Sequence, residues 1–363
     1  MAKKITTVRG DISPEQLGFT SIHDHTFLDM RVSGQYMESL FPGVPQEMVR
    51  FTPENYGFLK SGTYLMCKDL QVVDDLEGLV KEYGYFAAIG GRSVCDAAPS
   101  TGRGDIRKIQ ALSERTGLNI ICATGIYHEA AIPEELRNRG TEFYYSFCKK
   151  EIEQGIDGTD IHPGLLKAAL ATGSETETDV LEACTRLSAE TGLSLHVHTE
   201  PTMDGDKILE LLGRLTEKYG VDPRRIVVCH MDNRIAGGVT VTDYLTHPEQ
   251  DRTLDLTVQR ALLDRGYNIG LDTWGMPVVN PYFFMPDDFE RMKALVTLID
   301  LGYAGQITLG NDFSSKLMWR AYGGYGCTRF EEYALPLLEQ LGRGEAIKKL
   351  VYENPARILS YEA

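Results

Sequence analysis

Two histidines near the N-terminus, His23 and His25, stand two residues apart at the end of an apolar-leaning run. If this run forms a strand, residues i and i+2 point to the same face, so the two imidazoles can converge on one point. Such a pair is typical of metal ligands, although two strand histidines that are satisfied by hydrogen bonds are an equally ordinary arrangement. Residues elsewhere in the chain decide between these interpretations.

Further residues of ligand type stand at the ends of apolar runs much later in the chain. They occur in the segments Leu195-His196-Val197-His198, Val228-Cys229-His230 and Leu309-Gly310-Asn311-Asp312. Imidazoles and a carboxylate together suit zinc, manganese, iron or cobalt, whereas magnesium or calcium would use more oxygen ligands. These side chains favour the interpretation of His23 and His25 as part of a metal centre.

Lys167 is the least expected member of this group, because an ammonium has no lone pair and repels a cation. Its amine could instead react with carbon dioxide to give a carbamate, N6-carboxylysine, whose two oxygens can bridge two cations. On this interpretation Lys167 stands at the centre of a site for two divalent metal ions.

Short β-rich runs alternate with longer helical patterns, which indicates parallel strands joined by helical crossovers. Eight units of this kind form an α/β (β/α)8 TIM barrel, whose active site lies at the carboxyl ends of the strands. We expect residues 1–363 to form this single domain, because no linker or low-complexity stretch divides the chain. The predicted strands cover about residues 18–25, 91–96, 118–124, 164–168, 193–198, 225–230, 267–273 and 306–312, with helical patterns between them, such as Val73–Tyr83, Gly104–Arg115, Asp179–Thr191 and Ile208–Lys218.

The residues of ligand type fall where a barrel places its active site. They lie on or close to the ends of the first, fourth, fifth, sixth and eighth predicted strands, where an ordinary core would favour valine, isoleucine or leucine. Two long connections, residues 30–62 and 313–330, follow the first and the eighth strand and should form lids or walls of the pocket. The apolar connection 30–62 has a second interpretation, contact with another subunit in a homodimer.

The composition restricts the partners. A formal net charge of −15 disfavours nucleic acids and anionic membranes, because both attract a basic face. No apolar run reaches membrane-spanning length, and the N-terminus lacks the apolar core of a signal peptide. The seven cysteines never form a Cys-x-x-Cys pair, which favours buried free thiols in a reducing compartment. We expect a soluble, cytoplasmic protein that acts on a small-molecule substrate.

With these residues in view, the chain resembles the phosphotriesterase family of the amidohydrolase superfamily, including its lactonases and the phosphotriesterase homology proteins. The resemblance covers nearly the whole length, and the order and spacing of its landmarks are more specific than any one of them. The landmarks are His23-Asp24-His25; Val94-Cys95-Asp96-Ala97 with Gly102-Arg103-Gly104-Asp105; Ala123-Thr124-Gly125-Ile126-Tyr127; Gly164-Leu165-Leu166-Lys167; His198-Thr199; His230-Met231-Asp232; Gly270-Leu271-Asp272; Asn311-Asp312; and Asn354-Pro355-Ala356-Arg357.

The resemblance implies a binuclear centre, with zinc as the leading metal and manganese, cobalt or iron as alternatives. It also implies that a hydroxide bridging the metals is the nucleophile and that Asp312 accepts its proton. The implied ligands are His23, His25 and Asp312 for the more buried ion, His198 and His230 for the more exposed ion, and carboxylated Lys167 between the two.

The fifth strand offers two histidines on the same face, His196 and His198. The family pattern of a ligand followed by threonine selects His198. His196 lies one pleat deeper and is expected to be a core or supporting histidine.

Substrate contacts are expected after the third and the seventh strand, at Tyr127, His128, Thr273 and Trp274. Tyr127 stands where lactonases of the family carry a tyrosine, and its phenol could hydrogen-bond a carbonyl or leaving-group oxygen. Lactonases commonly carry arginine and tyrosine at positions 273 and 274, and phosphotriesterases carry histidine at 273. Thr273 and Trp274 therefore argue against a close acyl-homoserine lactonase and against efficient organophosphate hydrolysis.

Four further charged residues could take part in the reaction or in substrate binding. Asp232 could accept a proton after His230, but the histidine partner that the family offers at position 273 is missing. Arg103, Lys316 and Arg320 could bind a phosphate or carboxylate of the substrate if they face the pocket. Solvated side chains or ion pairs are the ordinary alternative for each of these three.

The leading hypothesis is a binuclear metal-dependent hydrolase of an ester-like bond in a small molecule, with a lactone, such as a sugar lactone, as substrate. The same centre could act on a phosphoester or an amide. A non-catalytic barrel that binds a ligand is the alternative from another class, although loss of ligands would be its natural signature. A dinucleotide oxidoreductase and a serine hydrolase are disfavoured, because the chain lacks both Gly-x-Gly-x-x-Gly after the first strand and a Gly-x-Ser-x-Gly elbow.

Overall fold

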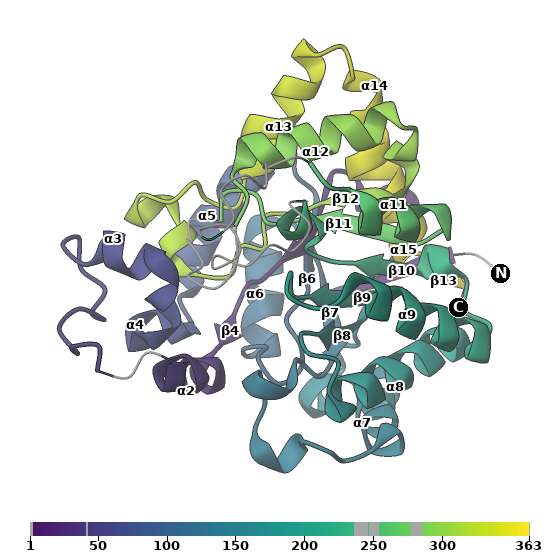
Figure 1. The fold of residues 1–363 in the computed structure, drawn as a ribbon, viewed down its shortest axis with the longest axis horizontal. Helices are drawn as coiled ribbons and strands as arrows, with labels where there is room; N and C mark the ends of the chain where they lie inside the picture. The colour runs from purple at the N-terminus through teal and green to yellow at the C-terminus, as the bar shows by residue number, and fades with distance from the viewer. Residues whose placement is uncertain (1–2, 41–42, 236–245, 247–253, 277–284, 363) are drawn as a thin grey trace.

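The computed structural model describes residues 3–40, 43–235, 246, 254–276 and 285–362. Its centre is one sheet of eight parallel strands in the order β3-β6-β7-β8-β9-β10-β11-β12, with helices around it (Figure 1). All eight predicted strands are present, and the α/β barrel prediction is confirmed. The strands are β3 (Thr20–Asp24), β6 (Ser93–Asp96), β7 (Asn119–Gly125), β8 (Leu165–Leu170), β9 (Leu195–Thr199), β10 (Ile226–Val228), β11 (Asn268–Leu271) and β12 (Ile307–Leu309).

The first and last barrel strands, β3 and β12, meet through hydrogen bonds beyond the end of β12. The Asp312 N–H donates to the His23 carbonyl at 3.0 Å, and the His25 N–H donates to the Phe313 carbonyl at 3.1 Å. The Asp24 carboxylate adds a third link, because it accepts a hydrogen bond from the Phe313 N–H at 3.1 Å. This seam, at which the barrel is nearly closed, fixes the relative positions of three predicted metal ligands.

Helices follow the strands and cover the outside of the barrel. Helix α6 (Ile106–Thr116) begins at a cap from Asp105, and α8 (Glu175–Thr191) begins at a cap from Ser174. Both end at a left-handed glycine, so local sequence sets both ends of each helix. The other helices are α1 (Pro14–Leu17), α2 (Arg31–Leu40), α3 (Tyr56–Phe58), α4 (Lys68–Gln71), α5 (Leu76–Ala88), α7 (Thr141–Gln154), α9 (Gly205–Tyr219), α11 (Thr257–Asp264), α12 (Asp288–Asp300), α13 (Arg329–Gln340), α14 (Gly344–Lys348) and α15 (Asn354–Leu359).

Two small sheets lie outside the barrel, and the sequence pattern predicts neither of them. β1 (Lys3–Thr7) pairs antiparallel with both β2 (Gly10–Ile12) and β13 (Tyr361–Glu362), so the two ends of the described chain lie side by side (Figure 1). β4 (Leu28–Asp29) pairs antiparallel with β5 (Val72–Val73). The helix predicted from position 73 therefore begins later, and the first long connection extends beyond residue 62.

The connection between β4 and β5 packs on the connection that follows β12. Leu59, Cys67 and Leu70 form a small apolar cluster with Leu317 from the later connection. The Tyr56 hydroxyl donates a hydrogen bond to the Leu317 carbonyl at 2.8 Å. The two long connections therefore support each other, and both contribute walls to the pocket described below.

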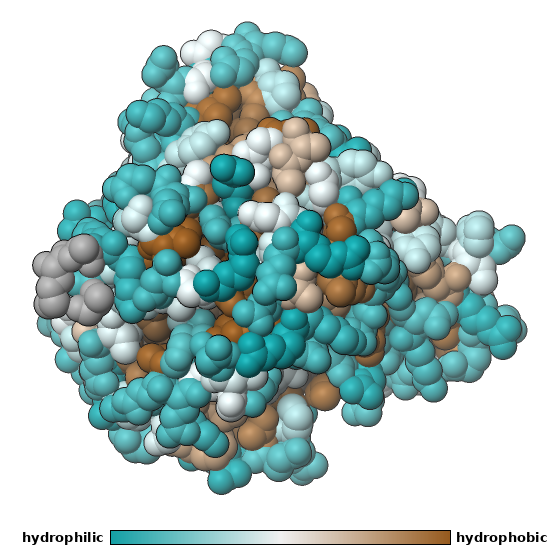
Figure 2. All heavy atoms as spheres, turned by 180° about the vertical axis from the view of Figure 1, so that it is seen from behind, coloured by the Kyte–Doolittle hydropathy of each residue, from teal (hydrophilic) through white to brown (hydrophobic). Residues whose placement is uncertain are grey.

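The interior is apolar, and its pattern on the helices follows the helical period. On α8, for example, Val180, Cys184 and Leu187 are buried, at the spacing that places side chains on one helix face. All seven cysteines are buried and free, as their isolated positions predict. Figure 2 shows one face of the molecule, on which polar residues predominate and apolar residues occur between them. Within the described ranges, no helix is both long and apolar enough to cross a membrane.

Candidate metal centre

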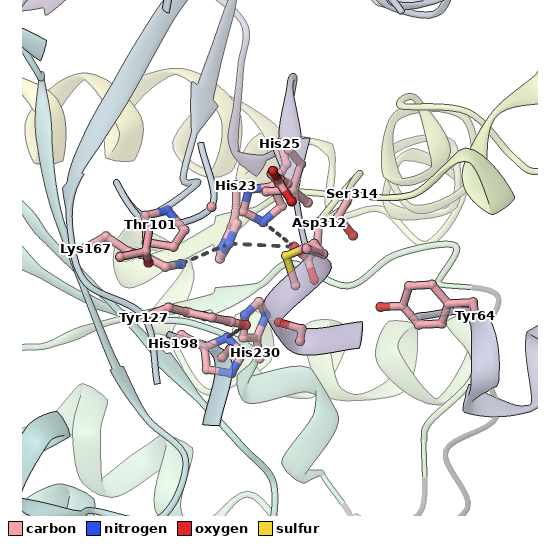
Figure 3. Close-up of a pocket in the computed structure, with 17 residues that line it drawn as sticks. His23, His25, Tyr64, Thr101, Tyr127, Lys167, His198, His230, Asp312 and Ser314 are labelled. Carbon is pink, nitrogen blue, oxygen red and sulfur yellow. Dashed lines mark hydrogen bonds and ion pairs between the residues drawn. The ribbon is translucent and has the colours of Figure 1, made fainter. Parts of the chain in front are cut away.

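The six predicted ligands all line one pocket at the carboxyl ends of the barrel strands. Figure 3 shows that their side chains point into the same space from different strands. An apolar core would not gather four imidazoles, an amine and a carboxylate, so the arrangement indicates a binding site for cations. These six residues are His23, His25, Lys167, His198, His230 and Asp312.

His23, His25 and Asp312 form one compact group of potential ligand atoms. One such atom from each residue lies within 4.8 Å of the others, and Asp312 Oδ1 is 3.0 Å from His25 Nε2 and 3.8 Å from His23 Nε2. Burial alone would raise the pKa of Asp312, but the hydrogen bond from His25 and the charge of His230 hold that pKa well below its usual value. The group therefore offers two imidazoles and an ionised carboxylate to one point.

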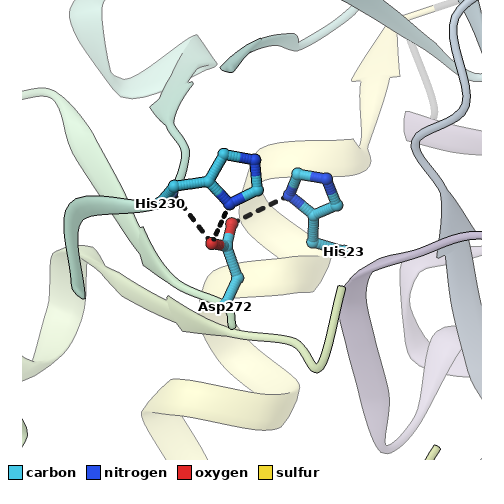
Figure 4. Close-up of side chains that lie close together, drawn as sticks. All are labelled: His23, His230 and Asp272. Carbon is cyan, nitrogen blue, oxygen red and sulfur yellow. Dashed lines mark hydrogen bonds and ion pairs between the residues drawn. The ribbon is translucent and has the colours of Figure 1, made fainter. Parts of the chain in front are cut away.

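Asp272, immediately after β11, joins two of the histidines. His23 Nδ1 donates to one of its oxygens at 2.8 Å, and His230 Nδ1 donates to the other at 2.9 Å (Figure 4). An ionised carboxylate only accepts, so both rings carry a hydrogen on Nδ1 and keep Nε2 for a metal ion. Atoms of these three residues also lie within 4.8 Å of one another, but the bonds at Nδ1 make Asp272 a support for two ligands.

The sequence pattern marks Asp272 only as a family landmark and gives it no role in the site. The signal that could have identified it is its position, because it is an acidic residue at the carboxyl end of the seventh barrel strand. That end of the strand is where a TIM barrel places catalytic side chains.

The surroundings of His23 and His230 shift their pKa values in opposite directions. Burial and the nearby Lys167 lower the pKa of His23 to about 3, which leaves a neutral ring. Burial also opposes a charge on His230, but the Asp272 carboxylate outweighs it and raises the pKa of His230 to about 9. A metal ion that binds His230 would therefore displace a proton.

Lys167 is almost completely buried, with 1 % of its surface exposed. Its Nζ lies 3.2 Å from His23 Nε2, and among the described residues no carboxylate lies within the 4.0 Å ion-pair distance. A buried ammonium without a counter-charge is strongly unfavourable. A carbamate at this position would replace the unpaired cation by an anion, so the surroundings of Lys167 fit a residue that holds metal ions.

The ring of His198 lies beside that of His230, with 4.6 Å between their centres. Its Nε2 lies 3.1 Å from the Glu200 carboxylate, and its Nδ1 lies 3.4 Å from the Tyr127 hydroxyl. Burial lowers the pKa of His198 to about 4, so this ring is also neutral. Glu200 is a further residue of the site that the sequence pattern does not single out.

His196 lies one pleat below His198 on β9, opposite Lys167 in the strand register. Neither of its ring nitrogens has a hydrogen-bond partner among the described residues, and burial lowers its pKa well below the usual value. The pocket lining contains His198 and not His196.

Among the described residues, Tyr127 is the one predicted substrate contact that lines the pocket. His128 stacks over His198 outside the lining, with 6.2 Å between the ring centres. Trp274 is fully buried, and its indole N–H donates to a backbone carbonyl of β11 at 2.9 Å. Thr273 is buried as well. The structure therefore does not bring Thr273 and Trp274 to the described walls of the pocket.

Asp232 has a partner that sequence reasoning misses. Arg291 of α12 is 1 % exposed, and its Nε lies 3.2 Å from Asp232 Oδ2. Thr273 donates its N–H and its hydroxyl to the same oxygen, at 2.9 and 2.8 Å. The imidazole that the family offers at position 273 is absent, as the sequence shows, and a guanidinium and a hydroxyl contact Asp232 in its place. This ion pair holds the end of β10 against α12.

The three cations considered as anion ligands lie away from the described walls of the pocket. Arg103 pairs with Glu151 at 2.8 Å, and Arg320 pairs with Glu332 at 2.6 Å. Neither of them lines the pocket, and Lys316 does not line it either.

The remaining described walls combine apolar and hydroxyl groups with one carboxylate, that of Asp29. Apart from the four histidines and Lys167, this lining contains no basic side chain. Its members are Leu28, Asp29, Met30, Ser33, Tyr64, Pro99, Thr101, Gly102, Tyr127, Ala131 and Ser314.

Two of the predicted ligands have an unusual backbone. His230 has φ 61° and Asp312 has φ 48°, in the left-handed region that costs a residue other than glycine about 1–3 kcal/mol. A left-handed residue cannot continue a strand, so β10 and β12 end earlier than predicted. The strained backbone turns both side chains into the pocket.

The fold and the pocket together define a (β/α)8 barrel with a candidate binuclear centre of histidine and aspartate ligands. This combination is typical of metal-dependent hydrolases. The model of the Phosphotriesterase family matches residues 3–245 and 238–359. The chain therefore belongs to the phosphotriesterase family, which confirms the resemblance seen in its landmarks.

Individual relatives are distant but match over the whole chain. An N-acetyltaurine hydrolase from Xenopus tropicalis is 26 % identical over 374 aligned residues, which cover 100 % of this chain and 99 % of the relative. A resiniferatoxin-binding protein from Rhodobacter sphaeroides has a TM-score of 0.80 at 27 % identity, with 98 % of this chain and 94 % of that chain covered. A lactonase from Listeria monocytogenes shares the fold, with a TM-score of 0.74, 21 % identity and 99 % and 100 % covered.

Proposed function

We propose that the protein hydrolyses a small molecule with the help of two divalent metal ions, zinc being the first candidate. Two neutral rings, an ionised carboxylate and a buried amine without a counter-charge support this proposal. When bound, the two cations would lower the pKa of a water molecule toward neutrality and polarise the bond to be cleaved. The proposed ligands are His23, His25 and Asp312 for one ion, His198 and His230 for the other, and Lys167, as its carbamate, for both.

Asp312 is the proposed proton acceptor. Its Oδ1 faces His23 and His25, so an attacking water held by the same groups would lie beside it. The hydrogen bond from His25 and the charge of His230 keep its pKa low, so the carboxylate is ionised at neutral pH, although the same low pKa makes it a weak base in the metal-free protein. General-base assistance of this kind typically contributes about 10²–10⁴-fold to a rate.

The substrate class follows from the walls of the pocket. The described lining offers the phenols of Tyr64 and Tyr127 and the apolar side chains of Leu28 and Met30, but no arginine. An anionic substrate group would find no fixed guanidinium there. A neutral carbonyl compound fits these walls better than a phosphate monoester or diester, and a lactone is our first candidate.

An amide is the second candidate, because one observation favours it. The N-acetyltaurine hydrolase from Xenopus tropicalis, whose name states an amide substrate, aligns with the whole chain. Taurine carries a sulfonate, however, and the described lining contains no arginine to bind one. We therefore expect that any amide substrate of this protein is uncharged.

A panel of neutral lactones, neutral amides and phosphoesters, assayed with protein loaded with zinc or manganese in bicarbonate, tests this proposal. We expect turnover of at least one lactone and a fall in kcat of about 100-fold or more in Asp312→Asn, since that variant loses the general base. Asp300→Asn is the matched control, because Asp300 pairs with Arg343 at the surface and does not line the pocket.

Two results would contradict the proposal. Faster turnover of phosphoesters than of every lactone and amide would refute the substrate class. Unchanged activity in Asp312→Asn, with the same metal content as the wild type, would refute the role of Asp312 as proton acceptor.

A further inference from the structure

We propose that Glu200 is a positioning residue for the second metal ion, because it turns His198 so that Nδ1 and not Nε2 faces the centre. This inference rests on the two-metal site of the proposed function. One contact carries it, since His198 Nε2 lies 3.1 Å from Glu200 Oε1. An ionised carboxylate accepts hydrogen bonds only, so the ring carries its hydrogen on Nε2 and keeps a lone pair on Nδ1.

Two of the other histidines around the centre have the opposite orientation. His23 and His230 donate from Nδ1 to Asp272 and keep Nε2 for the pocket. Among the described residues, Asp272 makes no hydrogen bond with His198, so a different carboxylate has to orient that ring. Glu200 fills this role, and the two carboxylates together fix three of the four proposed imidazole ligands.

The chain holds Glu200 in place through the end of β9. His198 and Glu200 are two residues apart, the spacing that puts both side chains on one face of an extended segment. The Glu200 N–H donates to the Leu170 carbonyl at the end of β8 at 3.2 Å, and the Glu200 carbonyl accepts from the Met203 N–H at 3.0 Å. The carboxylate therefore stands on a backbone that is fixed on both sides.

An ordinary surface ion pair is the alternative explanation, and the surroundings of Glu200 disfavour it. Its side chain is 32 % exposed, and that of His198 is 11 % exposed. In the described part of the chain, neither a lysine nor an arginine pairs with Glu200, whose one ion-pair partner there is His198. Among the described residues, the Glu200 carboxylate therefore pairs with His198, a proposed metal ligand, and not with a surface cation.

Metal titration of the full-length protein tests this inference without any substrate. Zinc affinity is measured by competition with a chelator, and cobalt(II) is used for the visible spectrum, which reports the ligand geometry. We expect Glu200→Ala to bind the second ion about 10–100-fold more weakly, as is typical when the carboxylate behind a ligating histidine is lost. The first ion should bind as in the wild type.

Two variants serve as controls for this titration. Glu200→Gln keeps an oxygen that can accept the Nε2 hydrogen bond, so it should recover part of the affinity and the cobalt spectrum. Asp29→Asn removes the same unit of charge from the pocket wall without touching a histidine, and it should bind both ions normally.

Three results would overturn the inference. The first is wild-type affinity and spectrum in Glu200→Ala, and the second is a wild-type protein that binds a single equivalent of metal. The third concerns the double variant His198→Ala/Glu200→Ala. If Glu200 acts through His198, the double variant should bind no more weakly than His198→Ala alone, whereas additive losses would mean that Glu200 acts independently.

The outcome for Glu200 can be separated from that for the proposed reaction. A wild-type protein that binds two ions but cleaves no compound of the panel would refute the proposed reaction and leave the Glu200 titration fully interpretable. A wild-type protein that cleaves lactones while Glu200→Ala binds metal normally would refute only the role of Glu200.

Discussion

At the scale of single residues, the centre depends on groups that do not themselves contact the metal in our proposal. Asp272 accepts hydrogen bonds from His23 and His230. One carboxylate therefore sets the orientation of two rings, and its loss would release both at once. Other side chains stand around the pocket with groups that remain free for a substrate.

Tyr64 is such a side chain. It belongs to a short 3₁₀ segment, Tyr64–Met66, in the connection between β4 and β5, and it lines the pocket. Figure 3 shows its hydroxyl pointing toward the side of Asp312. Among the described residues, that hydroxyl has no hydrogen-bond partner, so it remains free to donate to a substrate oxygen.

Tyr64→Phe should lower kcat/KM by about 2- to 10-fold, mainly through KM, because one hydrogen bond to substrate is worth about 0.5–1.5 kcal/mol. Steady-state kinetics on the best substrate of the panel measure this change. Tyr56→Phe is the matched control, since the Tyr56 hydroxyl bonds the Leu317 carbonyl and does not line the pocket. Equal kinetics for Tyr64→Phe and the wild type would exclude the contact.

At the scale of elements, the contact between α12 and the end of β10 is a buried ion pair. Arg291 pairs with Asp232, which follows His230 by two residues. The Arg291 guanidinium also donates to Thr273 at 3.1 Å. The helix therefore holds the segment that carries a proposed metal ligand.

Arg291→Met should lower the free energy of unfolding by about 3–5 kcal/mol, because it leaves the Asp232 charge buried without its partner. Denaturant unfolding with metal present measures this change. Arg343→Met is the matched control, since Arg343 pairs with Asp300 at the surface and such pairs contribute about 0–1 kcal/mol. A loss as small as that of the control would show that Asp232 does not depend on Arg291.

The sequence predicts those parts of the site that lie at strand ends. His23 and Asp312 could be found because each follows an apolar run. The barrel could be predicted because eight such runs alternate with helical patterns. Arg291 could not be found in this way, since its role depends on how far a side chain of a distant helix reaches in the folded protein. Glu200 could have been predicted from the sequence, because it is two residues from His198, the same spacing as between His23 and His25.

At the scale of the whole molecule, the proposed metal ions would join elements from the two ends of the chain. Proposed ligands follow or lie on β3, β8, β9, β10 and β12. A ligand that binds only the folded state stabilises it, by about 4.1 kcal/mol at a concentration 1,000 times its Kd. Whether the apolar connection after β3 also meets a second subunit stays a prediction.

Removal of metal with a chelator should therefore lower the melting temperature by about 5 °C or more. Addition of zinc with bicarbonate should restore it, whereas magnesium should not, because the site offers mainly imidazoles. Differential scanning calorimetry with metal analysis of each sample measures the effect. A melting temperature that is the same in metal-free and zinc-loaded protein would contradict a metal centre that ties the barrel together.

The seam between β3 and β12 has a consequence for the synthesis of the protein in the cell. It joins Asp24 to Phe313, which are 289 residues apart. At about 5–20 residues per second, a ribosome needs roughly 15–60 s to cover that distance. During this time β3 cannot pair with β12, and His23 and His25 have no Asp312 beside them. The complete set of proposed ligands exists only after Asp312 has been synthesised, so the proposed centre could take up both metal ions only after translation has passed the last barrel strand.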